Sequence, residues 1–157
     1  MKICALCLPA EVDKQIIDDL TETVSEDKRK RIARYLRHED MLRALLGEIL
    51  ARLMICRETK IRSSDIEFYT NEYGKPFLRG VDNLFFNVSH SGSWVVCALD
   101  TQPVGIDVEK MEPIKLDIAA GIFSPVEYDK MQQKQEKEKK EYFYNLWTLK
   151  ESYIKNA

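Results

Sequence analysis

Residues 104–109 read Val-Gly-Ile-Asp-Val-Glu, and the interpretation of the whole chain depends on this short stretch. Its alternation of apolar and other residues predicts a β-strand over Val104–Val108. Because successive side chains of a strand point to opposite faces, Asp107 and Glu109 are expected to share one face. Two carboxylates this close repel each other, and a hard divalent cation would relieve that repulsion. The alternative is a solvent-facing acidic edge on a half-buried strand.

A second stretch, Leu146–Lys155, reads Leu-Trp-Thr-Leu-Lys-Glu-Ser-Tyr-Ile-Lys and has the apolar spacing of a helix. Glu151 and Lys155 lie four residues apart, so one helix face offers a third carboxylate and an ammonium group. A set of oxygen ligands suits Mg²⁺, which commonly bridges substrate phosphates. The alternative is that Glu151 and Lys155 form only an exposed ion pair of little energetic weight.

Strand patterns dominate the middle of the chain and its start. Residues 2–8, 84–88 and 94–99 are predicted strands, and the last two are joined through His-Ser-Gly-Ser at 90–93, which is typical of a hairpin. Asn, Gly and Pro at 71–76 predict a further turn.

Helical patterns fill the remaining segments. Glu11–Val24 is amphipathic, and Ser25 then offers an N-cap oxygen to a long helical tract. The apolar stripe of this tract lapses at His38–Asp40, where we expect a break. Ser124–Glu127 combines a capping serine, a proline at the first helical position and a glutamate three residues after the cap. Tyr142–Ile154 again has helical spacing. The mixture predicts an α+β fold.

The composition limits the classes of function. At 157 residues, with 45% apolar and 32% charged residues, the chain has the balance of a globular protein with a core. Twenty-four basic and 26 acidic residues give a net charge of −2, which argues against nucleic-acid and membrane-surface partners. The apolar run that begins at Met1 is cut off by Pro9, too early for a signal peptide, so we expect a cytoplasmic protein. Cys4 and Cys7 are interpreted as small apolar side chains, not as a redox or zinc pair.

The joint occurrence of Gly-Ile-Asp-Val-Glu and, some forty residues later, Trp-x-x-Lys-Glu-Ser-x-x-Lys resembles the 4'-phosphopantetheinyl transferase superfamily. Phe86–Ser91 is similar to its Asn-x-Ser-His-Ser segment, and residues 73–76 are similar to its Gly-Lys-Pro turn. Residues 25–31 and 38–47 resemble the long helical tract of the single-chain members that activate surfactin synthetase. The resemblance covers essentially all 157 residues.

The resemblance implies a fold of two similar α/β halves with the active site in the cleft between them. Residues 1–103 would form the complete first half, on the coenzyme A side, and residues 104–157 an incomplete second half that carries the metal ligands. Relatives continue with several strands beyond this point. The apolar side chains expected to pack on those strands are Phe143, Leu146, Trp147, Leu149 and Ile154.

The resemblance also implies an activity. A serine hydroxyl of an apo acyl or peptidyl carrier protein would attack the pyrophosphate of coenzyme A in a Mg²⁺-dependent reaction that releases adenosine 3',5'-bisphosphate. The carrier would come from nonribosomal peptide, polyketide or fatty-acid synthesis, and full-length relatives are expected to be monomers. Such chemistry asks the protein mainly for positioning and for electrostatic stabilisation.

Site residues carry over by position. The metal ligands would be Asp107, Glu109 and Glu151, and these act in catalysis together with Lys155. Contacts to the nucleotide 3'-phosphate would come from Lys28, Arg31 and His90, and contacts along the cofactor from Arg43, Lys75, Ser89 and Lys155. Glu127 and Lys150 match further positions that line the site. Glu151 or a metal-bound water could take the serine proton.

Other interpretations stay open at this point. Taken singly, Lys28 and Arg31 could be solvated helix charges, and Ser89 and His90 could be ordinary turn residues. Ala44 stands where close relatives often have a hydroxyl residue, a loss worth about 1.5–3 kcal/mol at most. The chain could be a truncated product with reduced or no activity, or a module that binds coenzyme A or a carrier protein without turnover. A metal-dependent nuclease is disfavoured because no basic groove is evident.

Overall fold

A three-stranded antiparallel sheet, ordered β1-β5-β4, forms the centre of the structure. In this computed structural model, which describes residues 1–72 and 74–156, β1 (Lys2–Cys7) pairs with β5 (Trp94–Asp100), and β5 pairs with β4 (Phe85–Ser91). Only Gly92 and Ser93 connect β4 to β5, and Gly92 has the positive φ of 57° that a two-residue hairpin turn favours. The predicted hairpin is confirmed, although β4 extends three residues further than expected.

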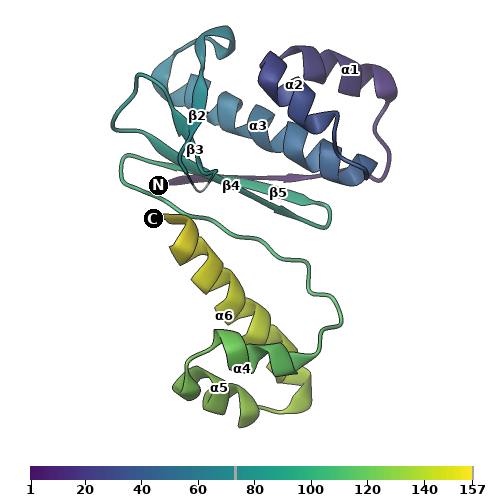
Figure 1. Ribbon diagram of the computed structural model, residues 1–157, viewed down its shortest axis with the longest axis vertical. Helices are drawn as coiled ribbons and strands as arrows, with labels where there is room; N and C mark the ends of the chain where they lie inside the picture. The colour runs from purple at the N-terminus through teal and green to yellow at the C-terminus, as the bar shows by residue number, and fades with distance from the viewer. Residues whose placement is uncertain (73, 157) are drawn as a thin grey trace.

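Three helices cover one face of this sheet (Figure 1). They are α1 (Lys14–Glu22), α2 (Glu26–Ile32) and α3 (His38–Thr59). α3 lies directly on the sheet, and its apolar residues share one core with residues of β4 and β5. The buried members of this core are Leu50, Ala51, Ile55, Ile66, Leu78, Leu84, Phe86, Val95, Cys97 and Leu99.

The break in the long helical tract lies earlier than predicted. Ser25 caps α2 as expected, because its Oγ accepts a hydrogen bond from the backbone N–H of Lys28 at 3.3 Å. α2 ends at Ile32, and residues 33–37 separate it from α3. The prediction of a break at His38–Asp40 was therefore wrong: these residues form the first turn of α3, where acidic side chains are favoured by the positive end of the helix.

A two-stranded ribbon and a short 3-10 turn lie between α3 and β4 in the chain. η1 (Ser63–Asp65) precedes β2 (Phe68–Thr70), which pairs with β3 (Pro76–Leu78). The predicted turn between them is present, since the backbone N–H groups of Gly74 and Lys75 both donate to Asn71. The central residue of that turn, position 73, lies outside the described residues, as does residue 157.

The chain after β5 crosses to the opposite side of the sheet and forms a small helical cluster (Figure 1). Its elements are η2 (Leu116–Ile118), α4 (Ala119–Ile122), α5 (Pro125–Gln132) and α6 (Glu136–Asn156). Ser124 closes the predicted capping box on α5, because its Oγ accepts from Glu127 N while the Glu127 carboxylate accepts from Ser124 N.

The helical cluster has a core of its own. Phe143 is 1% exposed and packs with Phe123 and Met131. Leu146 and Trp147 are partly buried against the same core. The expectation that all five apolar side chains of α6 depend on further strands was therefore wrong for these three, because α4 and α5 cover that face of α6.

The remaining apolar side chains of α6 lie on another face, and that face is open. Leu149, Tyr153 and Ile154 are 65%, 79% and 64% exposed. Within the part of the chain that the structure describes, no element covers them.

The predicted strand over Val104–Val108 was wrong. No strand is formed between residues 101 and 115; instead, this segment is held to β4 by side chains. A strand requires a backbone ladder with a neighbour, and here side-chain oxygens of β4 accept the hydrogen bonds that a neighbouring strand would otherwise accept. Among the described helices, none is both long and apolar enough to span a bilayer.

Candidate active site

The segment that follows β5 is fixed on the sheet face opposite α3. Residues 86 and 88 of β4 point towards α3, so Asn87, Ser89 and Ser91 point to the other face. There the backbone N–H groups of residues 106, 108 and 110 donate to Asn87 Oδ1, Ser89 Oγ and Ser91 Oγ at 2.9, 3.4 and 3.0 Å. Every second backbone amide is thus held, which aligns the segment parallel to β4 and fixes where its acidic side chains lie.

Gly105 brings this segment into backbone contact with the end of α6. A Cβ atom at this position would lie 1.9 Å from the carbonyl oxygen of Ser152 and 2.7 Å from the backbone nitrogen of Asn156. No residue with a side chain fits there without moving the helix. The glycine of the Val-Gly-Ile-Asp-Val-Glu stretch therefore permits the close approach that places Lys155 beside Asp107.

Asp107 is the most deeply buried acid of the candidate site, with 2% of its side chain exposed. Its Oδ1 accepts hydrogen bonds from the Lys155 ammonium at 2.5 Å and from Ser89 Oγ at 2.8 Å. Its Oδ2 is buried, and no hydrogen-bond donor among the described residues reaches it. A buried carboxylate oxygen without a partner is costly unless a ligand or cation satisfies it.

The other two predicted metal ligands lie near Asp107 but are not drawn together with it. Glu109 is exposed and accepts a hydrogen bond from Ser91 Oγ at 3.0 Å. Glu151 is half-buried on α6, one helical turn before Lys155. Within residues 1–72 and 74–156, no three His, Cys, Asp or Glu side chains gather closely enough to hold a metal ion. The assignment of the three acids as ligands stays a prediction.

The chemistry of the predicted donors nevertheless suits a hard cation. The donors are all carboxylate oxygens, the ligand type that Mg²⁺ prefers. The free Oδ2 of Asp107 is a buried acceptor that a cation would satisfy, and the neighbouring Lys155 ammonium already supplies positive charge to Oδ1. The observation that supports metal binding is therefore this buried oxygen without a partner.

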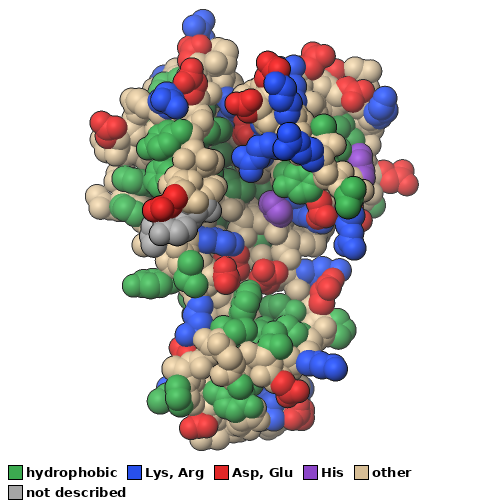
Figure 2. All heavy atoms as spheres, in the orientation of Figure 1, with side chains coloured by type: hydrophobic (Ala, Val, Ile, Leu, Met, Phe, Trp, Pro, Cys, Tyr) green, Lys and Arg blue, Asp and Glu red, His purple; other side chains and the backbone are tan. Residues whose placement is uncertain are grey.

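A large open cavity of about 980 Å³ lies on the other side of β4, between α2, α3 and the β2–β3 ribbon. Figure 2 shows Lys and Arg side chains gathered over α2 on this side of the molecule. Three predicted 3'-phosphate contacts, Lys28, Arg31 and His90, line this one cavity. Its other charged lining residues are Asp27, Lys30, Arg34, Glu48, Arg52, Glu67 and Arg79. Basic side chains outnumber acidic ones, so the cavity carries local positive charge in a chain of slightly negative net charge.

Burial lowers the pKa of two of the predicted 3'-phosphate contacts. Desolvation lowers the pKa of Lys28, and the neighbouring cations Arg31 and Arg52 lower it further, while Glu48 opposes these effects. Desolvation also lowers the pKa of His90, even though one side of this residue faces solvent.

The predicted contacts along the cofactor are spread over several places. Ser89 and Lys155 lie at Asp107, as described above. Arg43 lines a second cavity of about 830 Å³ together with Glu109, and it donates to the Gly92 carbonyl at 2.6 Å. Burial lowers the pKa of Lys75, whose Nζ lies 5.6 Å from the centroid of the Phe77 ring.

Glu127 and Lys150, predicted to line the site, form an ion pair with each other. Lys150 Nζ lies 2.9 Å from Glu127 Oε2, and this hydrogen bond lowers the pKa of the glutamate. The pair joins α5 to α6.

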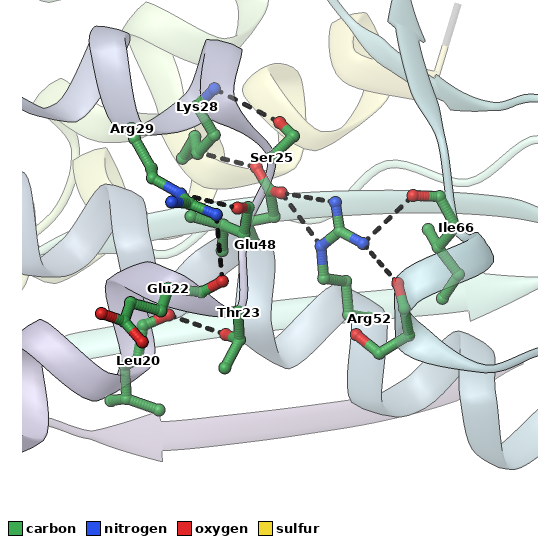
Figure 3. Close-up of polar contacts among 11 residues, drawn as sticks. Leu20, Glu22, Thr23, Ser25, Lys28, Arg29, Glu48, Arg52 and Ile66 are labelled. Atoms are coloured by element: carbon green, nitrogen blue, oxygen red, sulfur yellow. Dashed lines mark hydrogen bonds and ion pairs between the residues drawn. The ribbon is translucent and has the colours of Figure 1, made fainter.

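Among the charged residues of the cavity wall that sequence reasoning missed, Glu48 and Arg52 form an ion pair with each other. Arg52 is 6% exposed, and its guanidinium donates twice to Glu48 Oε1, through Nε at 3.0 Å and Nη2 at 2.9 Å (Figure 3). The available signal was a Glu and an Arg four residues apart on the apolar stretch of α3, a spacing that places them side by side. Asn87 and Ser91 were quoted in a motif but given no role, and they hold the segment that carries Asp107.

Family models match both parts of the chain. Residues 12–102 match the model described as 4'-phosphopantetheinyl transferase, N-terminal, and residues 103–157 match the 4'-phosphopantetheinyl transferase superfamily. The chain therefore belongs to the 4'-phosphopantetheinyl transferase family, and the resemblance inferred from its residues is confirmed. The predicted α+β fold, with an N-terminal transferase domain and part of a second one, is confirmed as well.

Individual relatives agree with this assignment. The chain is similar to 4'-phosphopantetheinyl transferase Sfp of Bacillus subtilis strain 168, with 43% identity over 155 residues that cover 99% of this chain and 69% of Sfp. It is also similar to the transferases gsp of Aneurinibacillus migulanus (42% over 149 residues; 94% of this chain, 62% of gsp) and psf-1 of Bacillus pumilus (40% over 158 residues; 99% and 68%). The chain is thus shorter than each of these relatives.

Proposed function

We propose that this chain transfers 4'-phosphopantetheine from coenzyme A to a serine hydroxyl of an apo acyl or peptidyl carrier protein, in the cytoplasm, with release of adenosine 3',5'-bisphosphate. The single observation that carries the proposal is the Asp107 centre. A buried carboxylate with one oxygen paired to Lys155 and the other without a partner lies on a segment that also presents Glu109. Membership of the family supplies the reaction class.

In this proposal, the nucleotide and the metal ion bind on opposite sides of β4. Residues 1–103 would bind the nucleotide of coenzyme A, with Lys28, Arg31 and His90 holding its 3'-phosphate in the basic cavity. Residues 104–157 would hold Mg²⁺ through Asp107, Glu109 and Glu151. Bound Mg²⁺ would neutralise charge on the pyrophosphate of coenzyme A.

The chain's own groups would then position the reaction. Lys155, which donates to Asp107 at 2.5 Å, would stabilise negative charge that develops on the leaving phosphate. Glu151 lies one helical turn away and is our candidate for accepting the proton of the carrier serine. Ser89 orients Asp107 through its hydroxyl at 2.8 Å.

Intact-mass analysis tests this function directly. An apo carrier protein is incubated with the chain, coenzyme A and Mg²⁺, and a mass gain of one phosphopantetheine group is expected. A carrier with its serine changed to alanine should gain nothing, and Sfp serves as the positive control. No mass gain with a carrier that Sfp modifies would contradict the proposal of turnover.

A second candidate function is binding of coenzyme A or a carrier protein without turnover. The exposure of Leu149, Tyr153 and Ile154 favours it, because one face of α6, the helix that carries Glu151 and Lys155, is left uncovered by the described residues. Calorimetry with coenzyme A, with and without Mg²⁺, separates the candidates: metal-dependent binding without carrier modification supports the binding module. Absence of metal-dependent binding rules out the coenzyme A-binding module.

A further inference from the structure

Three charged side chains at the wall of the basic cavity form one buried network (Figure 3). The side chains of Lys28, Glu48 and Arg52 are only 17%, 11% and 7% exposed. Glu48 lies in the middle: its Oε1 accepts from Arg52, and its Oε2 lies 3.6 Å from the Lys28 ammonium. One carboxylate thus serves two cations, and each of its oxygens has a different partner.

Arg52 is anchored by the protein itself. Besides the two hydrogen bonds to Glu48, its Nη1 donates to the carbonyl oxygens of Ser63 and Ile66 at 2.8 and 3.1 Å. Its guanidinium also lies 5.0 Å from the centroid of the Phe68 ring. Four of its five N–H groups are therefore used inside the fold, so Arg52 fixes Glu48 and has little capacity left for a ligand.

Lys28, in contrast to Arg52, has few partners in the part of the fold that the structure describes. Among the ion pairs of the described residues, Glu48 is its one acidic partner, at a distance longer than a good hydrogen bond. Its ammonium lines the cavity and carries three N–H donors, so it can turn to a bound anion without breaking the fold. The network combines a rigid anchor, a shared carboxylate and one adaptable cation.

We propose that Glu48 is a positioning residue for anion binding: clamped by Arg52, it holds the Lys28 ammonium charged and in place at the cavity wall, ready for a phosphate monoester dianion. The inference rests on the proposed function, which assigns this cavity to the 3'-phosphate of coenzyme A. Glu48 itself does not touch the phosphate.

The surrounding charges explain why the Glu48 carboxylate matters for the charge of Lys28. Arg31 from α2 and Arg52 from α3 both lower the pKa of Lys28, and Lys28 in turn lowers the pKa of His90 from β4. Desolvation acts in the same direction, and Glu48 opposes both. Without the Glu48 carboxylate, the pKa of Lys28 falls further and its charge is lost at a lower pH.

The test compares wild type with Glu48→Gln and Glu48→Asp. Glutamine keeps the shape and an acceptor for Arg52 but removes the charge, whereas aspartate keeps the charge. NMR titration of the Lys28 side chain in the ligand-free protein should show a pKa lower by about one unit or more in Glu48→Gln, as expected for loss of an adjacent opposite charge. In Glu48→Asp, the Lys28 pKa should stay closer to the wild-type value.

Calorimetry with adenosine 3',5'-bisphosphate, across pH 7 to 10, gives the second readout. The pH at which affinity falls should move down in Glu48→Gln in step with the Lys28 pKa, and thermal melts check that each variant is folded. In Lys28→Arg, whose side chain does not deprotonate in this range, the affinity should not depend on Glu48→Gln in this way. This variant also keeps the test decisive if Glu48→Gln does not fold: a Lys28→Arg protein with the wild-type pH profile overturns the proposal.

The outcomes separate this inference from the proposed function. If wild type binds the nucleotide and Glu48→Gln leaves both the Lys28 pKa and the pH profile unchanged, the role of Glu48 is wrong and the nucleotide site stands. If wild type does not bind adenosine 3',5'-bisphosphate, the nucleotide site and the role of Glu48 in anion binding are both wrong, whatever the NMR titration shows.

Discussion

Among single residues, Asp107 has the most demanding environment in the candidate site. Its side chain is almost fully buried, one oxygen is shared by Lys155 and Ser89, and the other has no partner among the described residues. A carboxylate in such a place is stable only with nearby positive charge. This explains why Lys155 lies against it and why a cation would fit at the free oxygen.

Asp107→Asn should abolish most of the Mg²⁺-dependent part of coenzyme A binding. The loss should be at least 10-fold, because even groups that only orient a metal ligand are typically worth about 10–100-fold in metal affinity. Calorimetry with and without Mg²⁺ measures it. Asp129→Asn, at an exposed position on α5, is the matched control and should bind like wild type. Equal metal dependence in both variants would contradict a role for Asp107 as ligand.

Gly105→Ala should destabilise the chain, because the new Cβ would lie 1.9 Å from the Ser152 carbonyl oxygen. Relief of such a clash requires a backbone shift, with an expected cost of about 1–3 kcal/mol in the free energy of unfolding. Chemical denaturation measures this cost. Gly121→Ala is the control, since a Cβ there meets nothing within 4 Å and should be tolerated. If the two variants are equally stable, α6 does not pack on Gly105 as described.

At the scale of elements, residues 104–110 show how a segment can be aligned without becoming a strand. Side-chain oxygens of β4, not a backbone ladder, accept its alternate N–H groups. The segment therefore depends on three polar side chains on one face of one strand. Of these, Asn87 and Ser89 are buried, with 5% and 6% exposure.

Asn87→Ala should release this segment, because the Ile106 N–H loses its acceptor. We expect a cost of about 1–3 kcal/mol for the unsatisfied group, and faster hydrogen exchange at residues 106–110 than in wild type. Asn83→Ala, at an exposed position just before β4, is the matched control. Unchanged exchange at residue 106 in Asn87→Ala would show that this hydrogen bond does not hold the segment.

At the scale of the whole molecule, the two sides of the central sheet have different degrees of closure. α3, with α1 and α2 packed on it, lies over one face, whereas the other face carries the 104–110 segment and the end of α6 (Figure 1). α6 is buried where α4 and α5 pack on it and open at Leu149, Tyr153 and Ile154. Contiguous exposed apolar side chains of this size favour association.

The double substitution Leu149→Lys and Ile154→Lys should therefore reduce self-association at high protein concentration. Light scattering coupled to size-exclusion chromatography measures the mass as a function of concentration. Val126→Lys is the control, because it adds a charge at an apolar side chain that is 63% exposed on α5, away from this face. A wild-type chain that stays monomeric at all concentrations would contradict this role of the α6 face.

Local features of the chain could be predicted from sequence because they depend on residues a few positions apart. The caps at Ser25 and Ser124 and the β4–β5 hairpin are confirmed for that reason. The strand predicted at 104–108 failed because an alternating pattern specifies which face each side chain takes, but not whether a neighbouring strand is present to complete the ladder.

The sequence by itself determined the family, through two motifs whose order and spacing are specific, and it marked Asp107, Glu109, Glu151 and Lys155 as candidates. Only the tertiary structure showed that Lys155 donates a hydrogen bond to Asp107, 48 positions away in the chain. It also showed that Glu48 forms ion pairs with both Lys28 and Arg52. Contacts of this kind follow from the packing of α6 on Gly105 and of α2 on α3. Packing depends on shape and burial in three dimensions, which no local pattern of residues encodes.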